Sequence, residues 1–344
     1  MKISVVIPTR NRAHLILRLC ENIQAQTYKP SEIIIVDSSD EKEYKRRVIQ
    51  DFPHLPIMWI DSDPSVCIQR NRGITTATSQ WIFLCDDDIE LPPDYLEKLV
   101  DYASQHSDCG ALSGLLLNLE NGIWQDQYRI KNFADLLWRF IFQLSIWGDF
   151  NSVKASWLMQ PMFAKIKKWS SRKGNTYTRA GWPLITNWSG ESFKTKFYAL
   201  GASLIRREWL LQSPYDEVLD ASGLGDNYGV ALGFPGNEAI HVLTSTNAYH
   251  HKAKENRLAG QTAYYRRVLA LHYFIKLKRN THVNTTASTA WLIWSLLGNV
   301  LFYLLKRNLS LAFATLKAIG LICVGRNPYW IGNRKKKKVI QPVC

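Results

Sequence analysis

The first hundred residues alternate between short apolar runs and segments with a helical pattern, and this alternation restricts the chain to few architectures. The apolar runs are residues 3–8, 32–39, 57–60 and 81–85, and the helix-like segments between and after them are residues 13–26, 42–51, 66–78 and 93–107. The runs are apolar throughout, as in strands that are buried on both faces. We therefore expect an α/β fold with a mostly parallel sheet and helices on both faces.

Strand-like patterns return at residues 197–206 and 239–249, after a long segment that is rich in Trp, Phe and Lys. A chain of 344 residues exceeds one small core. The pattern predicts a catalytic domain over residues 1–255 and a helical, basic C-terminal region over 256–344. Within the catalytic domain we expect two halves, residues 1–123 and 197–255, separated by a helical, basic and aromatic insertion at 124–196.

Polar residues follow three of the predicted strands at their carboxyl ends. Thr9 ends the first strand, Asp37 ends the second, and Asp86-Asp87-Asp88 follow the run WIFLC. In open α/β sheets, ligands bind beyond the carboxyl ends of the strands, where the strand order reverses. The first strand is followed by neither GxGxxG nor GxxxxGK[ST], which argues against a dinucleotide fold and a P-loop.

The aspartate triplet has the chemistry of a metal-diphosphate site. Adjacent carboxylates repel one another unless a cation or a helix terminus relieves them. Mg²⁺ and Mn²⁺ prefer carboxylate oxygens, bind through few protein ligands, and neutralise the charge that develops on a departing diphosphate. A structural alternative is an acidic turn that caps the helix after Pro92-Pro93.

Ordered blocks of sequence carry a resemblance to a known family. The blocks VVIPTRNR, IIIVDSS, RNRGITTATSQWIFLCDDDIELPPDYLEKL and LGASLIRREWL resemble those of family 2 inverting glycosyltransferases, which have the GT-A fold. The resemblance is to bacterial-type enzymes of cell-surface glycan assembly, and it covers residues 1–123 and 197–255. It implies a nucleotide diphosphate-sugar donor, Mg²⁺ or Mn²⁺, and a single in-line displacement.

The resemblance also implies roles for individual residues. The positions that bind the nucleotide-sugar are Thr9, Asp37, Arg70, Asn71 and Asp86. Thr9 and Asp37 match the nucleobase side, Asp86 the ribose side, and Asp88 the metal side; Asp87 has no assigned role. Structural alternatives remain open, because Asp37 can form an Asx-turn with Ser39, Asn71 can cap a helix and Arg70 can be a solvated charge.

The family places the catalytic base, which deprotonates the acceptor hydroxyl, at the start of a helix late in the domain. Asp226 matches best, although the usual Glu-Asp pair is replaced by Gly225-Asp226. Asp220 and Glu217 are rivals, and a helix-capping aspartate is the structural alternative. A late histidine often reaches the metal in GT-A enzymes, and we expect His250 rather than its neighbour His251 to do so.

The second half of the chain is strongly basic. Residues 1–123 carry 12 basic and 18 acidic residues, whereas residues 124–344 carry 31 basic and 11 acidic ones. Seven of the 13 tryptophans lie between Trp124 and Trp188, and tryptophan is typical of membrane interfaces. Residues 287–305 carry no charge, and Lys335–Lys338 form a basic tail. We expect membrane-associated helices on an anionic membrane surface, in a re-entrant or interfacial arrangement.

The inferred acceptor is a glycan or a polyprenyl-linked saccharide at the cytoplasmic face of the cell membrane. The six cysteines are scattered without a CxxC pair, and the N-terminus makes a poor signal peptide, which favours a reducing compartment. Three other interpretations remain: a sugar nucleotidyltransferase, a non-enzymatic basic module that binds membranes or nucleic acid, and a degenerate transferase. The acidic edge of the sheet argues against nucleic acid, and none is expected as a partner.

Overall fold

The computed structural model describes residues 1–41, 43–120, 122–127, 130–150, 153–219, 222–236, 239–253, 255, 258–277 and 288–333. In the first half of the chain the elements are β1 (Ile3–Thr9), α1 (Ala13–Gln24), β2 (Glu32–Asp37), α2 (Tyr44–Asp51), β3 (Ile57–Asp61), α3 (Val66–Thr76), β4 (Trp81–Cys85), β5 (Ile89–Glu90), α4 (Tyr95–Gln105), β6 (Ala111–Glu120) and β7 (Ile123–Gln125). The strands and helices predicted for the first hundred residues are confirmed to within a few residues.

The second half carries the longest helices and, apart from β13, short strands. Its elements are α5 (Phe133–Ile141), β8 (Ile146–Trp147), the 3₁₀ helix η1 (Trp157–Met159), α6 (Gln160–Lys173), β9 (Thr176–Tyr177), β10 (Pro183–Ile185), β11 (Ser192–Thr195), β12 (Ala202–Arg206), α7 (Arg207–Gln212), α8 (Asp226–Ala231), β13 (Ile240–His250), α9 (Gly260–Leu277), α11 (Thr289–Leu305) and α12 (Leu309–Cys323).

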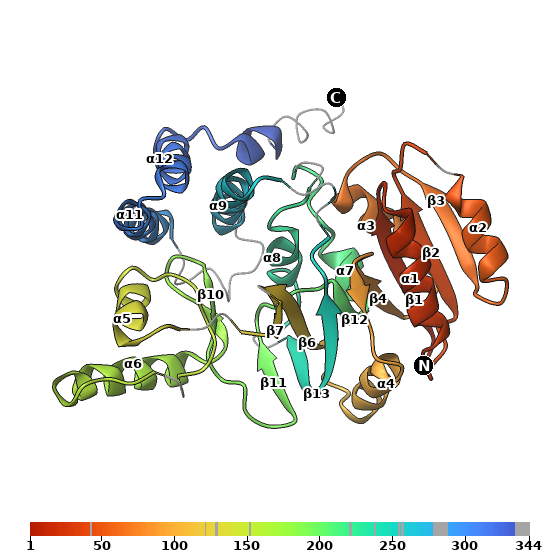
Figure 1. The fold of residues 1–344 in the computed structure, drawn as a ribbon, viewed down its shortest axis with the longest axis horizontal. Coiled ribbons are helices and arrows are strands. Elements are labelled where there is room, and N and C mark those ends of the chain that lie inside the picture. Colours follow the sequence, from red (N-terminus) through yellow and green to blue (C-terminus); the bar gives the residue numbers. More distant parts are fainter. Residues whose placement is uncertain are drawn as a thin grey trace, which may run out of the picture.

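A ten-stranded sheet forms the centre of the molecule (Figure 1). Its strand order is β11-β13-β6-β12-β4-β1-β2-β3, with β5 beside β13 and β7 beside β6. The four strands β3, β2, β1 and β4 are parallel, and β6 and β13 are parallel to each other. The order reverses at β1, which pairs with β2 on one side and β4 on the other, so β1 marks the switch point at which α/β sheets bind ligands.

The expectation of a mostly parallel sheet is only partly right. β12 runs antiparallel between β4 and β6, and β11, β5 and β7 are also antiparallel to their neighbours. The reason is that the chain returns from the insertion at the same end of the sheet where β4 finishes. The register pairs Ala202 with Cys85, so the residue before β12 lies beside the residue after β4.

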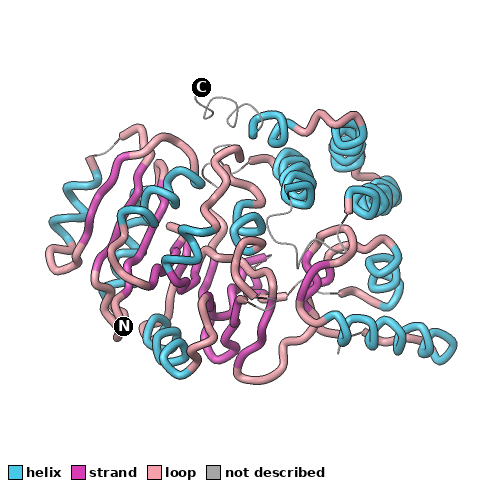
Figure 2. The backbone as a smooth tube through the Cα atoms, turned by 180° about the vertical axis from the view of Figure 1, so that it is seen from behind, coloured by secondary structure: helices cyan, strands magenta, loops and turns pink. Residues whose placement is uncertain are grey.

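Helices cover both faces of the parallel half of the sheet (Figures 1 and 2). Right-handed crossovers require this arrangement. The connection β1-α1-β2 runs in one direction across the sheet and β3-α3-β4 runs in the opposite direction, so their helices lie on opposite faces. α1 contacts α2, whereas α3 packs on β1 and β2 and also contacts α7. Gly73 of α3 faces Val6 and Val36 so closely that a Cβ atom there would overlap the Val6 side chain.

The aromatic insertion forms a small unit with a core of its own. A three-stranded sheet, β8-β10-β9, packs with α5 and α6 around a separate cluster of buried residues: Ile130, Phe133, Leu136, Ile146, Val153, Phe163, Ile166 and Leu184. β11 leaves this unit and pairs antiparallel with β13 of the main sheet. The main sheet therefore resumes at Ser192, before the position at which the sequence predicts the second half of the domain.

The three C-terminal helices pack on one another and on the catalytic domain. α9 contacts α8, α11 and α12, and the buried residues of all three helices join the same hydrophobic cluster as the central sheet. The segment predicted at 287–305 is the helix α11, Thr289–Leu305. Among the described residues no helix is both long and apolar enough to cross a bilayer. The predicted basic tail, Lys335–Lys338, lies outside the described residues.

The Gly73 contact predicts a different response from two helical glycines. We expect Gly73→Ala to lower the free energy of unfolding by about 1–3 kcal/mol, because the added methyl group overpacks the α3–β1 contact. Gly320, on α12, has open space around it, so Gly320→Ala should raise the free energy of unfolding by up to about 1 kcal/mol. Urea unfolding of both variants checks this, and a Gly73→Ala protein as stable as wild type would contradict it.

Candidate active site

The aspartate triplet follows β4 at the carboxyl edge of the sheet. The Asp86 amide donates to the Gly201 carbonyl at 2.8 Å, which fixes the turn against the start of β12. A Cβ atom on Gly201 would overlap the Asp86 carboxylate, so this position requires glycine. Asp87 and Asp88 are 4% and 2% exposed, and both are therefore buried carboxylates that require partners.

Arg70, on α3, joins Asp86 to the helix α8. Its Nη2 donates to Asp86 Oδ1 at 2.5 Å, and its Nη1 donates to Asp226 Oδ2. The guanidinium lies 4.9 Å from the centre of the Tyr215 ring, and it is almost fully buried. The sequence prediction placed Arg70 near the nucleotide-sugar; the structure shows its guanidinium between the predicted ribose-side carboxylate and the predicted base.

Asp226 is the first residue of α8, as predicted from the sequence. The residue before it, Gly225, has a φ of 93°, a conformation that glycine adopts without strain. This requirement explains why the usual acidic residue is absent at that position. Burial raises the pKa of the Asp226 carboxyl above its ordinary value, and the Arg70 guanidinium opposes that shift.

The rivals to Asp226 have different surroundings. Glu217 is exposed and accepts a hydrogen bond from Asn71 Nδ2 at 3.0 Å. Asp220 lies outside the described residues. The Asn71 side chain makes two hydrogen bonds to the backbone of Tyr215. Its Nδ2 donates to the Tyr215 carbonyl at 2.9 Å, and its Oδ1 accepts from the Tyr215 amide at 3.0 Å. Asn71 thus holds the Tyr215 ring under Arg70, and its predicted contact with the nucleotide-sugar stays a prediction.

Asp88 faces His250 across the edge of the sheet. His250 Nε2 lies 3.3 Å from Asp88 Oδ1, while His250 Nδ1 lies 3.1 Å from Asn118 Oδ1. The contact with Asn118 orients the His250 ring so that its Nε2 edge faces Asp88. His251 instead contacts Glu90, with Nε2 2.7 Å from Oε2.

A carboxylate oxygen and an imidazole nitrogen, both of which are possible metal ligands, thus lie close together at this edge of the sheet. In the described part of the chain no cluster of three or more His, Cys, Asp or Glu side chains is arranged to hold a metal ion alone. The pair fits the pattern of Mg²⁺ and Mn²⁺, which bind through one or two protein ligands and complete their coordination with substrate phosphates and water.

Asp87, which had no predicted role, anchors the loop after β1. Its Oδ1 accepts from Arg12 Nη1 at 2.7 Å, and its Oδ2 accepts from the Thr9 hydroxyl at 2.9 Å. Burial raises the pKa of Asp87 to about 6, with Arg12 acting in the opposite direction. Sequence reasoning missed the role of Arg12, and the only available signal was its position three residues after a predicted strand.

Asp37 ends β2 and is fully buried. Its Oδ1 accepts from the Ser39 amide at 2.7 Å, which is the Asx-turn considered from the sequence. Its Oδ2 has no hydrogen-bond partner among the described residues, which is unusual for a buried carboxylate. Gln69 donates to the carbonyls of Thr9 and Val36 at 2.7 and 2.8 Å, and so holds the ends of β1 and β2 at a fixed spacing.

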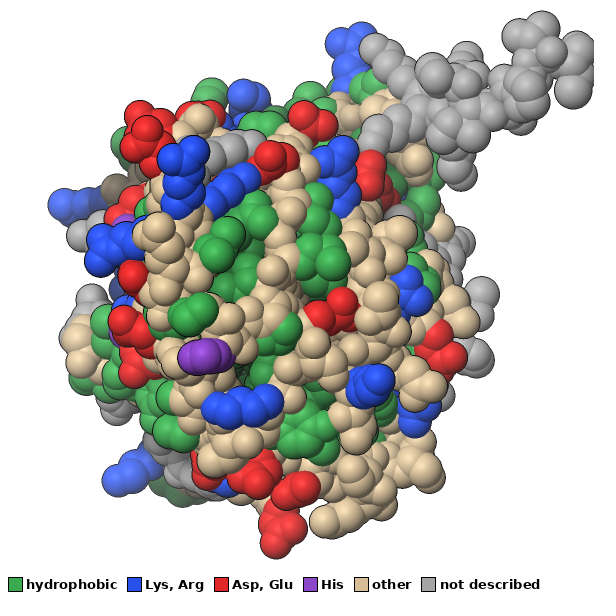
Figure 3. Space-filling view, turned by 90° about the vertical axis from the view of Figure 1, so that its right-hand side faces the viewer, with side chains coloured by type: hydrophobic (Ala, Val, Ile, Leu, Met, Phe, Trp, Pro, Cys, Tyr) green, Lys and Arg blue, Asp and Glu red, His purple; other side chains and the backbone are tan. Residues whose placement is uncertain are grey.

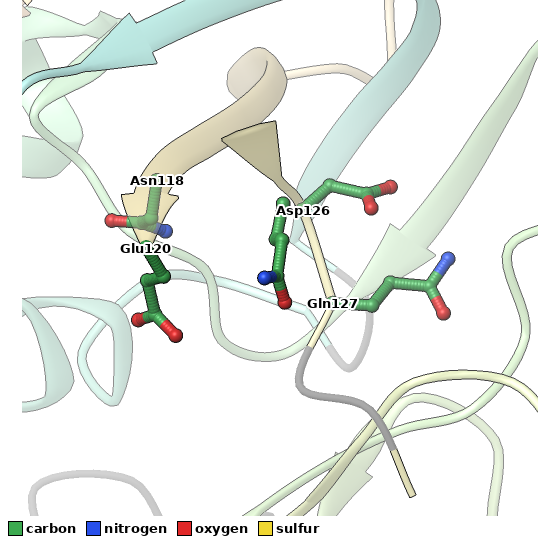
Figure 4. Close-up of a pocket in the computed structure, with 5 residues that line it drawn as sticks. Asn118, Glu120, Asp126 and Gln127 are labelled. Atoms are coloured by element: carbon green, nitrogen blue, oxygen red, sulfur yellow. The ribbon is translucent and has the colours of Figure 1, made fainter. Parts of the chain in front are cut away.

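A small hollow lies beside His250 on the β6–β7 hairpin (Figure 4). Its lining is entirely polar: Asn118, Glu120, Gln125, Asp126 and Gln127. A volume of about 10 Å³ holds roughly one water molecule, which is too little for a sugar. This hollow is therefore too small to hold a nucleotide-sugar.

The fold is an α/β sheet with a cluster of carboxylates at its switch point. The sequence model of the family described as "Glycosyl transferase family 2" matches residues 4–210. The chain belongs to this family. The match spans β1 through most of α7, and so includes the aspartate triplet and Arg70 but neither Asp226 nor His250.

Curated relatives match the N-terminal part of the chain. The uncharacterized glycosyltransferase YwdF of Bacillus subtilis is 39% identical over 101 residues, which is 29% of this chain and 37% of that protein. The glucosyl-dolichyl phosphate glucuronosyltransferase of Haloferax volcanii is 31% identical over 122 residues, or 34% of this chain and 39% of that protein. Each match thus covers less than two fifths of the relative's length.

Solved structures share the fold at low sequence identity. The mannosyltransferase PcManGT of Pyrobaculum calidifontis, in complex with GDP-Man and Mn²⁺, aligns with a TM-score of 0.50 and 16% identity over 97% of this chain and 86% of that one. GalNAc-T7 with UDP, GalNAc and Mn²⁺ aligns with a TM-score of 0.52 and 14% identity over 87% of this chain and 54% of that one. These likenesses establish a GT-A type of fold.

The Arg12–Asp87 pair predicts unequal costs for two neighbouring arginines. Arg12→Ala leaves Asp87 as a buried, poorly compensated charge and should lower the free energy of unfolding by about 3 kcal/mol. Arg10 pairs with Asp40 at 3.9 Å on the surface, so Arg10→Ala should cost less than about 1 kcal/mol. Thermal and urea unfolding at pH 7.5 compare the two variants, and equal losses would contradict the anchoring role of Asp87.

Proposed function

We propose that this chain is a metal-dependent, inverting glycosyltransferase that moves a sugar from a nucleotide diphosphate-sugar to a glycan or lipid-linked acceptor. The observation that carries the proposal is the convergence of three groups on one edge of the sheet. These are the Asp88–His250 pair, the Asp86–Arg70–Asp226 bridge and the buried Asp37 carboxylate. Donor binding, charge neutralisation and proton transfer each have a side chain of suitable chemistry there.

The donor nucleotide is proposed to bind across the ends of β1, β2 and β4. Asp37 Oδ2 is buried without a partner and can accept an N–H group of the nucleobase. Asp86 keeps part of its carboxylate accessible beside Gly201, where it can accept from a ribose hydroxyl. Thr9 uses its hydroxyl on Asp87, so its proposed contribution is to shape the base site through the β1 terminus.

Asp88 and His250 are proposed to hold Mg²⁺ or Mn²⁺ at the donor diphosphate. A bound divalent cation neutralises the charge that grows on the departing diphosphate. Asp88 Oδ2 accepts from the Ala253 amide at 2.9 Å, which leaves Oδ1 directed toward His250. Asn118 keeps the His250 ring in the orientation that presents Nε2. The two Mn²⁺-containing neighbours support the choice of cation class.

Asp226 is the proposed catalytic base. The acceptor oxygen forms its bond to the anomeric carbon as the bond from that carbon to the diphosphate breaks, and the acceptor proton passes to the Asp226 carboxylate. A raised pKa suits this step, because a stronger base takes the proton more readily. Arg70 is proposed as a positioning residue that fixes Asp226 relative to Asp86.

Family membership favours this function over the three other interpretations of the sequence. A sugar nucleotidyltransferase or a non-enzymatic basic module would not account for the match to glycosyl transferase family 2. A degenerate transferase would have no need for a buried aspartate at the start of α8 that is held by an arginine. The Haloferax relative, whose name specifies a dolichyl phosphate-linked glucose, supports a lipid-linked acceptor.

We also propose that the enzyme works at the cytoplasmic face of the membrane. Cys20, Cys67, Cys85 and Cys109 are buried free thiols, and Cys323 is an exposed one. Free thiols at both buried and exposed positions suit a reducing compartment. Fractionation of the native protein tests this placement: the proposal requires the chain to sediment with membranes and to be degraded by protease only after the membrane is opened.

The proposed base predicts a specific pair of kinetic outcomes. In an assay of nucleoside diphosphate release and sugar transfer over a panel of sugar nucleotides, Asp226→Asn should lower kcat about 10²–10⁴-fold while leaving donor binding intact. Glu217→Gln is the matched control, because it changes the nearest described rival by the same substitution, and it should retain most activity. EDTA should abolish transfer by the wild-type enzyme, and Mn²⁺ should restore it.

Two results would contradict this assignment. If Asp226→Asn transfers sugar as fast as wild type while Glu217→Gln does not, the base is Glu217. If transfer persists undiminished in EDTA, the metal dependence is wrong. The pH profile adds a further check, since the raised pKa of Asp226 places the acidic limb of the wild-type rate at higher pH than an exposed aspartate would.

A further inference from the structure

One side of the molecule carries most of the large apolar side chains that face solvent. Figures 1 and 2 show α12, α11, α5 and α6 along this side, away from β3 and α2. The C-terminal end of α6 leads into β9 of the small sheet, so the first turn of α6 lies at the opposite, outer end of the helix (Figure 1). We define the docking face as the exposed apolar residues of α11, α12 and the η1–α6 turn: Trp294, Leu297, Leu301, Leu304, Leu305, Leu309, Phe313, Leu316, Trp157, Leu158, Met159 and Met162.

α11 exposes large apolar side chains to solvent although it buries two polar ones. Ser295 and Asn299 of α11 point into the protein, where Ser295 accepts from Trp182 Nε1 and Asn299 donates to the Tyr264 hydroxyl, both at 2.8 Å. Leu292 and Leu296 of α11 are also buried, whereas Leu297, Leu301, Leu304 and Leu305 face solvent. A helix that faces water places its polar residues outside, so this arrangement is typical of a helix whose outer face meets an apolar phase.

The same surface has charge of only one sign. Residues 153–190 and 258–333 contain no Asp or Glu. Lys165, Lys167 and Lys168 are exposed on α6, and Lys306 and Arg307 are exposed at the turn between α11 and α12. Figure 3 shows the opposite side of the molecule, around β3 and α2, where acidic and basic side chains are intermixed. Apolar side chains bordered only by cations complement an anionic lipid surface.

From these observations we propose that the docking face binds the surface of an anionic phospholipid bilayer, with the α11–α12 hairpin and the η1–α6 turn inserted at the headgroup level. None of the described helices could cross the bilayer, so the interaction is peripheral. Trp157, at 85% exposed, and Phe313, at 71% exposed, are the aromatic anchors. Lys306 and Arg307 then lie beside the lipid phosphates.

The docking face is firmly connected to the catalytic residues. Gly229 of α8 packs directly under the Phe274 ring of α9, and α9 in turn packs against α12. Trp294 of α11 stacks on Phe142 after α5, with ring centres 5.0 Å apart. The proposal rests here on the proposed function. Binding of the α11–α12 hairpin to the bilayer would hold α8, which carries Asp226, at a fixed distance from the membrane surface. A lipid-linked acceptor would be presented at that surface.

Vesicle co-sedimentation of the full-length chain tests the proposal without any sugar nucleotide, so its result is independent of transferase activity. The vesicles are pure phosphatidylcholine or a 7:3 mixture with phosphatidylglycerol. Wild type should sediment with the anionic vesicles and far less with the neutral ones. Leu309→Ser/Phe313→Ser should weaken the partition coefficient at least about tenfold, and Lys306→Glu/Arg307→Glu by at least about 25-fold. Both pairs are exposed, so the fold should persist.

Matched controls lie on the opposite side of the molecule. Ile49→Ser/Met58→Ser removes two exposed apolar side chains, and Arg46→Glu/Arg47→Glu reverses two adjacent exposed charges on α2. Both controls should bind anionic vesicles like wild type. The proposal is overturned if wild type stays in the supernatant. It is also overturned if the docking-face variants still bind, because another segment would then be responsible for binding. A third contrary result would be a wild-type dimer that does not bind vesicles and that Leu309→Ser/Phe313→Ser splits in gel filtration.

Discussion

The guanidinium of Arg70 is the interaction on which the site depends. A buried cation is stable only if anions and hydrogen-bond acceptors surround it, and Asp86 and Asp226 supply them from two segments far apart in sequence. Asn71 positions the Tyr215 ring against the same guanidinium. The edge of the parallel sheet and the helix α8 are therefore joined through one side chain, which brings the proposed donor-side and acceptor-side carboxylates together.

The sequence was most informative where one local rule determined the outcome. Apolar runs predicted β1, β2 and β4 because strands buried on both faces admit few polar residues. Carboxylates at the ends of such strands predicted the site, because parallel strands bring their ends to one edge. The antiparallel course of β12 was missed, since strand direction depends on where the chain returns from a long insertion and not on the residues of the strand.

Pairings between distant segments account for the other differences. Nothing in the pattern around Asp87 distinguishes a residue that anchors Arg12 from one that binds substrate, and only the fold brings the two together. Asn71 matched a family position, yet its amide holds the backbone of Tyr215. Composition indicated a membrane-associated second half, but only the packing of α11, with Ser295 and Asn299 turned inward, shows which of its leucines face solvent.

The central claim is that Asp88, supported by His250, holds a divalent cation for a nucleoside diphosphate. Isothermal titration of UDP and GDP into wild type and Asp88→Asn, each with and without Mn²⁺, tests it most directly because no acceptor is needed. The account predicts that at least one nucleotide binds wild type only with Mn²⁺, and that Asp88→Asn loses this metal-dependent binding while it remains folded. Equal Mn²⁺-dependent binding by both proteins would contradict the assignment of this edge as the metal site.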